Sequence, residues 1–245
     1  MTTAAAWTCL APPLAATIAI AAGGTRISRR TAAYISTATT FGSFAAAVIA
    51  FVIMLGEDPH QRAHATTSWT WLSAGPYRFG LTLLTDQLSV MMMLIVAGVG
   101  GLIVAYSIGY MDGEDEERRY FAYMSLFVFS MLLLVQSGNL LLLLAGWGMV
   151  GLSSYLLIGF HHDRPSAIAA AKKAFIMNAV GDATFALALF LLILHTRSVG
   201  FDSLVQIHGS SSTIARRSSA ESPPGAAYSF AIPSDGSRTS RSTWR

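Results

Sequence analysis

Long apolar runs separated by short polar stretches dominate most of the chain. A helix needs about 20 apolar residues to cross the roughly 30 Å hydrocarbon core of a bilayer, and six of the runs are close to that length or longer. They predict membrane helices at residues 5–23, 32–55, 86–111, 120–136, 140–160 and 166–196. The pattern therefore predicts an all-α, polytopic membrane protein.

The chain divides into four segments of different composition. Residues 1–55 hold the first two predicted helices, and residues 85–208 hold the other four as a membrane core that is incomplete. Between them, residues 56–84 are polar, and alternating Thr and Trp followed by a Gly-Pro turn predict a short hairpin at the extracytoplasmic interface. Residues 209–245 are rich in Ser, Arg, Pro and Gly, which predicts a disordered tail.

Basic residues are distributed unevenly over the predicted loops. The first, third and fifth loops carry clustered Arg or Lys, whereas the fourth carries none. By the positive-inside rule the odd loops face the cytoplasm and the N-terminus lies outside. A cleaved signal peptide is the alternative reading of residues 5–23, but no Lys or Arg precedes that apolar core, which disfavours it.

Composition narrows the class of protein further. The chain is 53% hydrophobic and only 12% charged, whereas a soluble domain has roughly 25% charged residues. Cys9 is the single cysteine, so this chain cannot form a disulfide framework, an iron–sulfur site or a Cys-based zinc site by itself. The net charge is +3, but the sequence shows no groove of basic and aromatic residues. We therefore exclude nucleic-acid binding.

Candidate chemistry lies in the sixth apolar run, which carries Lys172, Lys173, Asn178 and Asp182. A charge inside a membrane helix costs roughly 2.5–3.5 kcal/mol on insertion scales, so such residues indicate function. Asn178 and Asp182 are four apart and share a helix face. Lys172 lies about 80° around the helix from Asp182, and Lys173 lies on the opposite side. These groups predict a proton relay.

Structural alternatives exist for each of these side chains. Lys172 and Lys173 can extend to the cytoplasmic interface while their stems stay in the apolar layer. Asp182 can make a structural hydrogen bond between helices. In the fifth run, the sequence predicts packing and water-access positions at Trp147, Gly148, Gly151, Ser153 and Ser154.

Several motifs occur in order along residues 65–208 and resemble one family. They read DQLSVMMMLIVAGVGGLIVAYSIGYM, RYFAYMSLFVFSMLLLVQSGN, GWGMVGLSSYLLIGF and AAAKKAFIMNAVGD. Together they resemble the large antiporter-like membrane subunit of NADH–quinone oxidoreductase, which is called subunit L in bacteria and chain 5 elsewhere. The Mrp-type sodium/proton antiporter and membrane hydrogenase subunits share this ancestry and remain the near alternative.

The resemblance implies a proton-translocating subunit of respiratory complex I in the bacterial inner membrane. The chain would be part of an enzyme while holding no redox site, cofactor or metal of its own. Quinone, NADH, flavin and iron–sulfur clusters would belong to partner subunits, and its contacts would be other membrane subunits and the lipid bilayer.

Two family positions carry over to this chain directly. The Lys of the K-A-F motif matches Lys173, and the Asp of the G-D motif matches Asp182. The resemblance thus implies that Lys173 and Asp182 are relay residues, and we expect Asn178 to give polar support.

Three positions depart from the family pattern. Gly148 stands where the family has Glu, Val104 where it has His, and Ala179 where it has Arg. Losing the Glu and the Arg together removes one charge of each sign. The family subunit also continues through further helices, so the sequence predicts an N-terminal portion, apparently truncated. A truncated structural fragment without transport activity is therefore the second alternative.

Overall fold

The computed structural model describes residues 2–56, 64–74, 77–114, 116–196 and 200–201. Within these residues six helices are long and apolar enough to cross a membrane, which confirms the predicted all-α, polytopic fold. They are α1 (Thr2–Gly23), α2 (Arg29–Leu55), α3 (Gln87–Tyr110), α4 (Glu117–Val135), α5 (Leu140–Ile158) and α6 (Pro165–Thr196). The predicted disordered tail at 209–245 lies outside the described residues.

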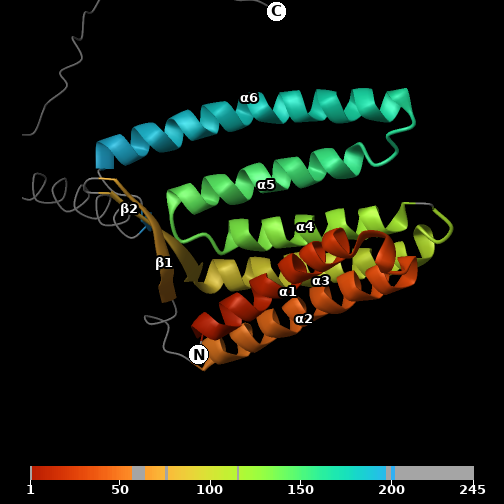
Figure 1. Ribbon diagram of the computed structural model, residues 1–245. Helices are drawn as coiled ribbons and strands as arrows, with labels where there is room; N and C mark the ends of the chain where they lie inside the picture. Colours follow the sequence, from red (N-terminus) through yellow and green to blue (C-terminus); the bar gives the residue numbers. More distant parts are fainter. Residues whose placement is uncertain (1, 57–63, 75–76, 115, 197–199, 202–245) are drawn as a thin grey trace, which may run out of the picture. The chain divides into compact units, whose positions relative to one another are not determined.

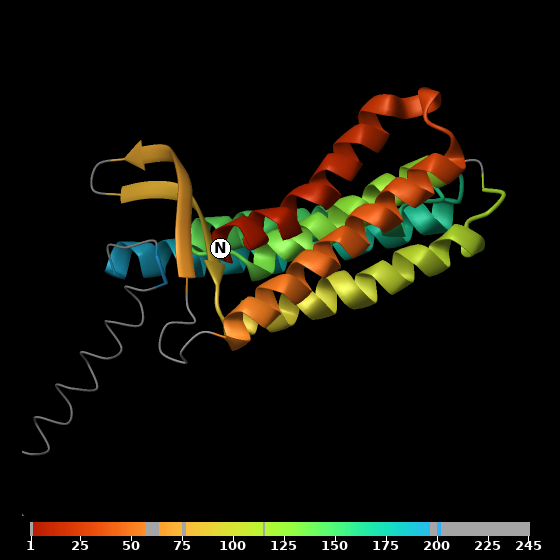
Figure 2. The same cartoon turned by 90° about the horizontal axis from the view of Figure 1, so that it is seen from below.

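The helices contact one another in an order that leaves α6 at one side (Figures 1 and 2). Helices α1 to α4 share contacts, α5 packs on α4, and α6 packs on α5. In the most apolar stretch of α4, 50% of the residues are buried inside the protein. In the corresponding stretches of α5 and α6 only 11% are buried. The main core lies between α1, α2, α3 and α4, where Cys9, Ala47, Met93 and Leu132 are fully buried.

Polar side chains mark where three of the helices begin. The Ser28 hydroxyl accepts from Thr31 N at 3.1 Å before α2. Asp86 Oδ1 accepts from Ser89 N at 2.7 Å before α3, and Asn139 caps α5 in the same way. Each bond satisfies a first-turn N–H that has no partner within its helix.

A two-stranded antiparallel sheet lies in the stretch where the sequence predicts a hairpin. Strand β1 (His64–Ala74) pairs with β2 (Tyr77–Thr85) at one end of the helices (Figure 1). The turn between α4 and α5 is bonded to β2, because Leu84 N donates to Gln136 O and Gly138 N donates to Thr82 O, both at 2.8 Å. A Cβ at Gly138 would lie 2.8 Å from that Thr82 oxygen, so this turn requires glycine.

Buried hydroxyls connect the helices across the apolar core. Ser36 on α2 and Ser125 on α4 are hydrogen-bonded at 2.8 Å and fully buried. Ser130 on α4 lies 3.4 Å from Ser153 on α5. Such bonds are worth about 0.6 kcal/mol on average in membrane proteins, and they fix which helix faces meet.

Small residues allow two close helix contacts. A Cβ at Gly101 on α3 would meet the Phe41 ring of α2 at 3.3 Å. On α5, a Cβ at Gly146 would lie 2.9 Å from Leu134 Cα of α4, a backbone atom that cannot move away cheaply. The α4–α5 contact therefore depends on the missing side chain at Gly146.

We expect Gly146→Ala to lower the free energy of unfolding by about 1–3 kcal/mol, because the added methyl forces α4 and α5 apart. Gly148→Ala adds the same methyl to the same helix where nothing lies within 4 Å, and it should not destabilise the protein. Unfolding in mixed micelles followed by circular dichroism compares the two. Equal stabilities would contradict the close contact.

Candidate functional site

Asp182 on α6 is bonded to Trp147 on α5. The indole Nε1–H donates to Asp182 Oδ1 at 2.7 Å. The Trp147 ring also contacts the Phe185 ring, with 5.3 Å between the centroids. Indole is a donor only, so this contact occupies one of the carboxyl oxygens and leaves the other for a second partner.

The local sequence explains why this carboxylate can approach α5. Gly151 lies one helical turn after Trp147, and a Cβ built there would be 3.7 Å from Asp182 Oδ2. Further along α6, Leu189 and Ile193 are buried against Leu140 of α5. Spacings of three and four residues place all these α6 positions on the side that faces α5.

A groove of about 510 Å³ surrounds Asp182. Its walls are mostly apolar and come from α4, α5 and α6, with Phe127 and Met131 contributed by α4. Asn178, Asp182 and the α5 residue Ser154 bring the polar groups. The structure thus places Asp182, a predicted relay residue, and Asn178, its predicted polar support, in the same groove.

Lys173 lies elsewhere on α6. It is exposed, like Lys172, and it does not line the groove. Near this turn, α6 meets α5 through the Phe175 ring, which lies 5.2 Å from the Tyr155 ring. No hydrogen bond or ion pair joins the Lys173 side chain to any other described residue. Its predicted role therefore requires a group that this part of the chain does not supply.

The three positions that depart from the family pattern have different surroundings. Gly148 is exposed and an added Cβ would meet nothing within 4 Å. Ala179 on α6 is exposed as well. Val104, in contrast, is fully buried in a cluster with Ile20 and Phe121. The space at Gly148 would accept a longer side chain, whereas at Val104 an imidazole would displace packed atoms.

The bond from Trp147 to Asp182 is the part of the site that sequence reasoning missed. The sequence predicts packing or water access for Trp147, and an interhelical hydrogen bond of Asp182 is only the alternative to its relay role. One signal was present in the sequence: an indole N–H inside an apolar run requires an acceptor. Asp182 is an acceptor in the neighbouring run.

Two protein-family models match the chain. Residues 71–121 match the model described as NADH-ubiquinone oxidoreductase (complex I), chain 5 N-terminus. Residues 137–222 match the model described as NADH:quinone oxidoreductase/Mrp antiporter, TM. NADH-quinone oxidoreductase subunit L of Mycobacterium tuberculosis is 45% identical over 188 residues, covering 76% of this chain. The chain belongs to the subunit L family of NADH-quinone oxidoreductase.

A second relative agrees with this membership, and a solved structure shares the fold. Subunit L of Escherichia coli is 43% identical over 163 residues, which is 66% of this chain. The chain spans 29% of the M. tuberculosis relative and 27% of the E. coli relative. In the solved structure of the Mrp complex from Dietzia, a chain superposes with a TM-score of 0.63 at 22% identity, covering 82% of this chain and 20% of that one. At that identity the similarity shows the fold.

Subunit L relatives are components of multi-subunit membrane complexes. Over the part of the chain that the structure describes, no group of three or more His, Cys, Asp or Glu side chains is arranged to hold a metal ion.

The contact between Trp147 and Asp182 should appear as coupling in a double-mutant cycle. Trp147→Phe keeps the aromatic contact with Phe185 but removes the donor, and Asp182→Leu removes both acceptor oxygens. We expect a coupling free energy of up to about 1.7 kcal/mol, the top of the range for hydrogen bonds between membrane helices. Unfolding in mixed micelles gives the four stabilities. Strictly additive effects would contradict the contact.

Proposed function

We propose that the chain is a membrane subunit of NADH-quinone oxidoreductase and that it couples quinone reduction in partner subunits to proton translocation. The observation that carries this proposal is the position of Asp182, a half-buried carboxyl group between two membrane helices. Ionisable groups at such positions are expensive and mark proton relays in pumps and transporters. Asp182 also lies within the segment that matches the antiporter-type family model.

Proton occupancy of Asp182 would be linked to the contact between α5 and α6. A hydrogen bond to an ionised carboxylate is roughly twice as strong as one between neutral groups. The bond that Trp147 donates therefore strengthens when Asp182 loses its proton and weakens when it gains one. Asn178 lies one turn away in the same groove, where its amide can hold water beside the carboxyl group.

Asp182 cannot by itself carry a proton across about 30 Å of hydrocarbon, which takes further groups or a chain of water. Lys173 is exposed on α6 and available to a group from a neighbouring segment or subunit. We assign it the role of modulating the relay from that side. NADH, flavin, iron–sulfur clusters and quinone belong to partner subunits in this proposal. The subunit lies in the bacterial inner membrane with its N-terminus outside.

A cation/proton antiporter is the second candidate function. The description of the family model for residues 137–222 names the Mrp antiporter beside NADH:quinone oxidoreductase. The two functions differ in what drives transport. Proton uptake that requires NADH favours the first function, and uptake driven by a sodium gradient without NADH favours the second.

In membranes that contain the complex, we expect Asp182→Asn to reduce NADH-driven proton uptake several-fold while the complex still assembles. Asp163→Asn is the matched control, because Asp163 lies in the loop before α6 with 89% of its side chain exposed. Proton uptake is followed with a pH-sensitive dye, and assembly by native gel. If the Asp182→Asn complex takes up as many protons as the unmodified complex, the relay role of Asp182 is contradicted.

A further inference from the structure

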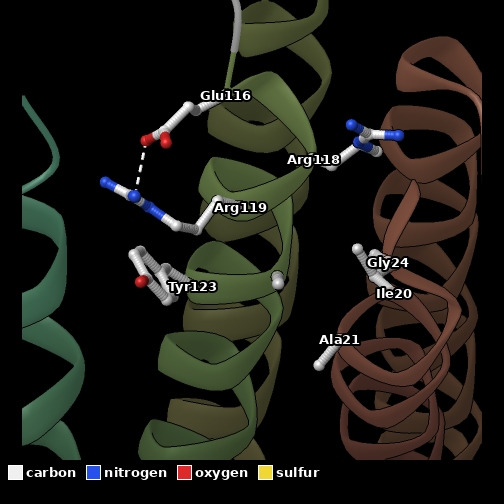
Figure 3. Close-up of a pocket in the computed structure, with 8 residues that line it drawn as sticks. Ile20, Ala21, Gly24, Glu116, Arg118, Arg119 and Tyr123 are labelled. Carbon is white, nitrogen blue, oxygen red and sulfur yellow. Dashed lines mark ion pairs between the residues drawn. The ribbon is translucent and has the colours of Figure 1, made fainter.

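A second pocket lies far along the chain from Asp182, between the end of α1 and the start of α4. Its volume is about 430 Å³. Ile20, Ala21 and Gly24 line it from the end of α1 and the following 3-10 turn η1 (Gly24–Arg26). The start of α4 completes the lining, with Glu116 at its N-cap and Arg118, Arg119, Ala122 and Tyr123 in its first two turns. Figure 3 shows these side chains around the start of α4.

Two arginines of the lining lie on opposite sides of the start of α4. Figure 3 shows Arg118 directed toward α1 and Arg119 directed away from it. Arg119 is paired with Glu116 at 2.5 Å and donates to Phe160 O at 2.7 Å. Arg118 donates one Nη1 bond, to Ile27 O at 3.0 Å. The lining therefore carries two guanidinium groups and one carboxylate, an excess of one positive charge, and Arg118 keeps donors for a ligand.

The other part of the pocket is apolar. Ile20 and Ala122 belong to a buried cluster that includes Phe121, and Ala21 lies beside Ile20 on the exposed side of α1. The α1 span ends at Gly23 and the α4 span begins at Glu117. The arginines are thus at the end of the apolar spans, and the apolar lining continues into them.

We propose that this pocket binds one anionic phospholipid. Its phosphate would be held by Arg118, and an acyl chain would lie along Ile20, Ala21 and Ala122. Basic pockets between membrane helices bind anionic headgroups in this way. The start of α4 also favours negative charge, because its first N–H groups and the helix dipole point there.

The ends of α1 and α4 would be joined by this lipid. Arg118 already contacts Ile27 in the connection between α1 and α2, and Arg29 at the start of α2 donates to Glu114 O at 3.2 Å. An anionic headgroup would add a bridge at the same end of the helices. The proposal is independent of the relay at Asp182.

The test uses the full chain in mild detergent, with phosphatidylglycerol as the probe and phosphatidylcholine of the same acyl chains as reference. Native mass spectrometry measures how much of each lipid is retained. We expect preferential retention of phosphatidylglycerol. Arg118→Gln should weaken its binding about fivefold, since each basic residue near a headgroup contributes roughly that factor. Arg164→Gln removes the same charge from an exposed residue between α5 and α6 and should have no effect.

A second variant tests the pocket without changing the charge. Ala21→Phe fills the apolar lining and should weaken phosphatidylglycerol binding as well. Arg118→Lys keeps the charge and should keep most of the phosphatidylglycerol binding. If Arg118→Gln does not fold, Arg118→Lys and Ala21→Phe together test the proposal.

Three outcomes would overturn the proposal. Equal losses in Arg118→Gln and Arg164→Gln would indicate diffuse attraction to the basic surface. Unchanged binding in Ala21→Phe would place the lipid outside this pocket. Displacement of phosphatidylglycerol by millimolar inorganic phosphate would make the site one for free phosphate.

Discussion

The absence of water from the bilayer core is the constraint on which the structure depends. Backbone groups in that layer must bond within the chain, which leaves only helices for the six apolar runs. The same constraint applies to polar side chains, which bond to carbonyls of their own helix or to groups of a neighbouring one. Ser36 therefore meets Ser125 between α2 and α4, and Trp147 meets Asp182 between α5 and α6. Non-helical backbone lies at the helix ends, where β2 bonds the turn before α5.

Burial is uneven among the helices, and this unevenness bears on function. α4 is half buried, whereas α5 and α6 keep most of their surface free of contacts within the described part of the chain. The bond from Trp147 to Asp182 lies between these two least-buried helices. A change of proton occupancy at Asp182 would therefore act on a weakly held contact, where a bond of about 1 kcal/mol matters most. The chain spans less than a third of its relatives, and in our proposal neighbouring segments or subunits meet the exposed faces of α5 and α6.

Hydropathy and helical periodicity predicted much of this molecule. The six spans follow from the length of the apolar runs, and Asn178 and Asp182 share a groove because four residues are close to one helical turn. The need of the Trp147 indole for an acceptor did not by itself identify Asp182, because the register between two helices depends on contacts such as Gly151 against the carboxylate. The tight approach of Gly146 to Leu134 is of the same kind. An apolar run shows that a helix is buried in membrane or protein, but not which face meets which neighbour.

In our proposal this chain acts as a subunit of a large NADH-oxidising membrane complex. The most direct measurement solubilises membranes in mild detergent, separates complexes on a native gel and identifies the chain in each band by mass spectrometry. The account predicts that the chain migrates with a band that oxidises NADH and contains other membrane subunits. A chain found only at low mass, or degraded while that band stays intact, would contradict it.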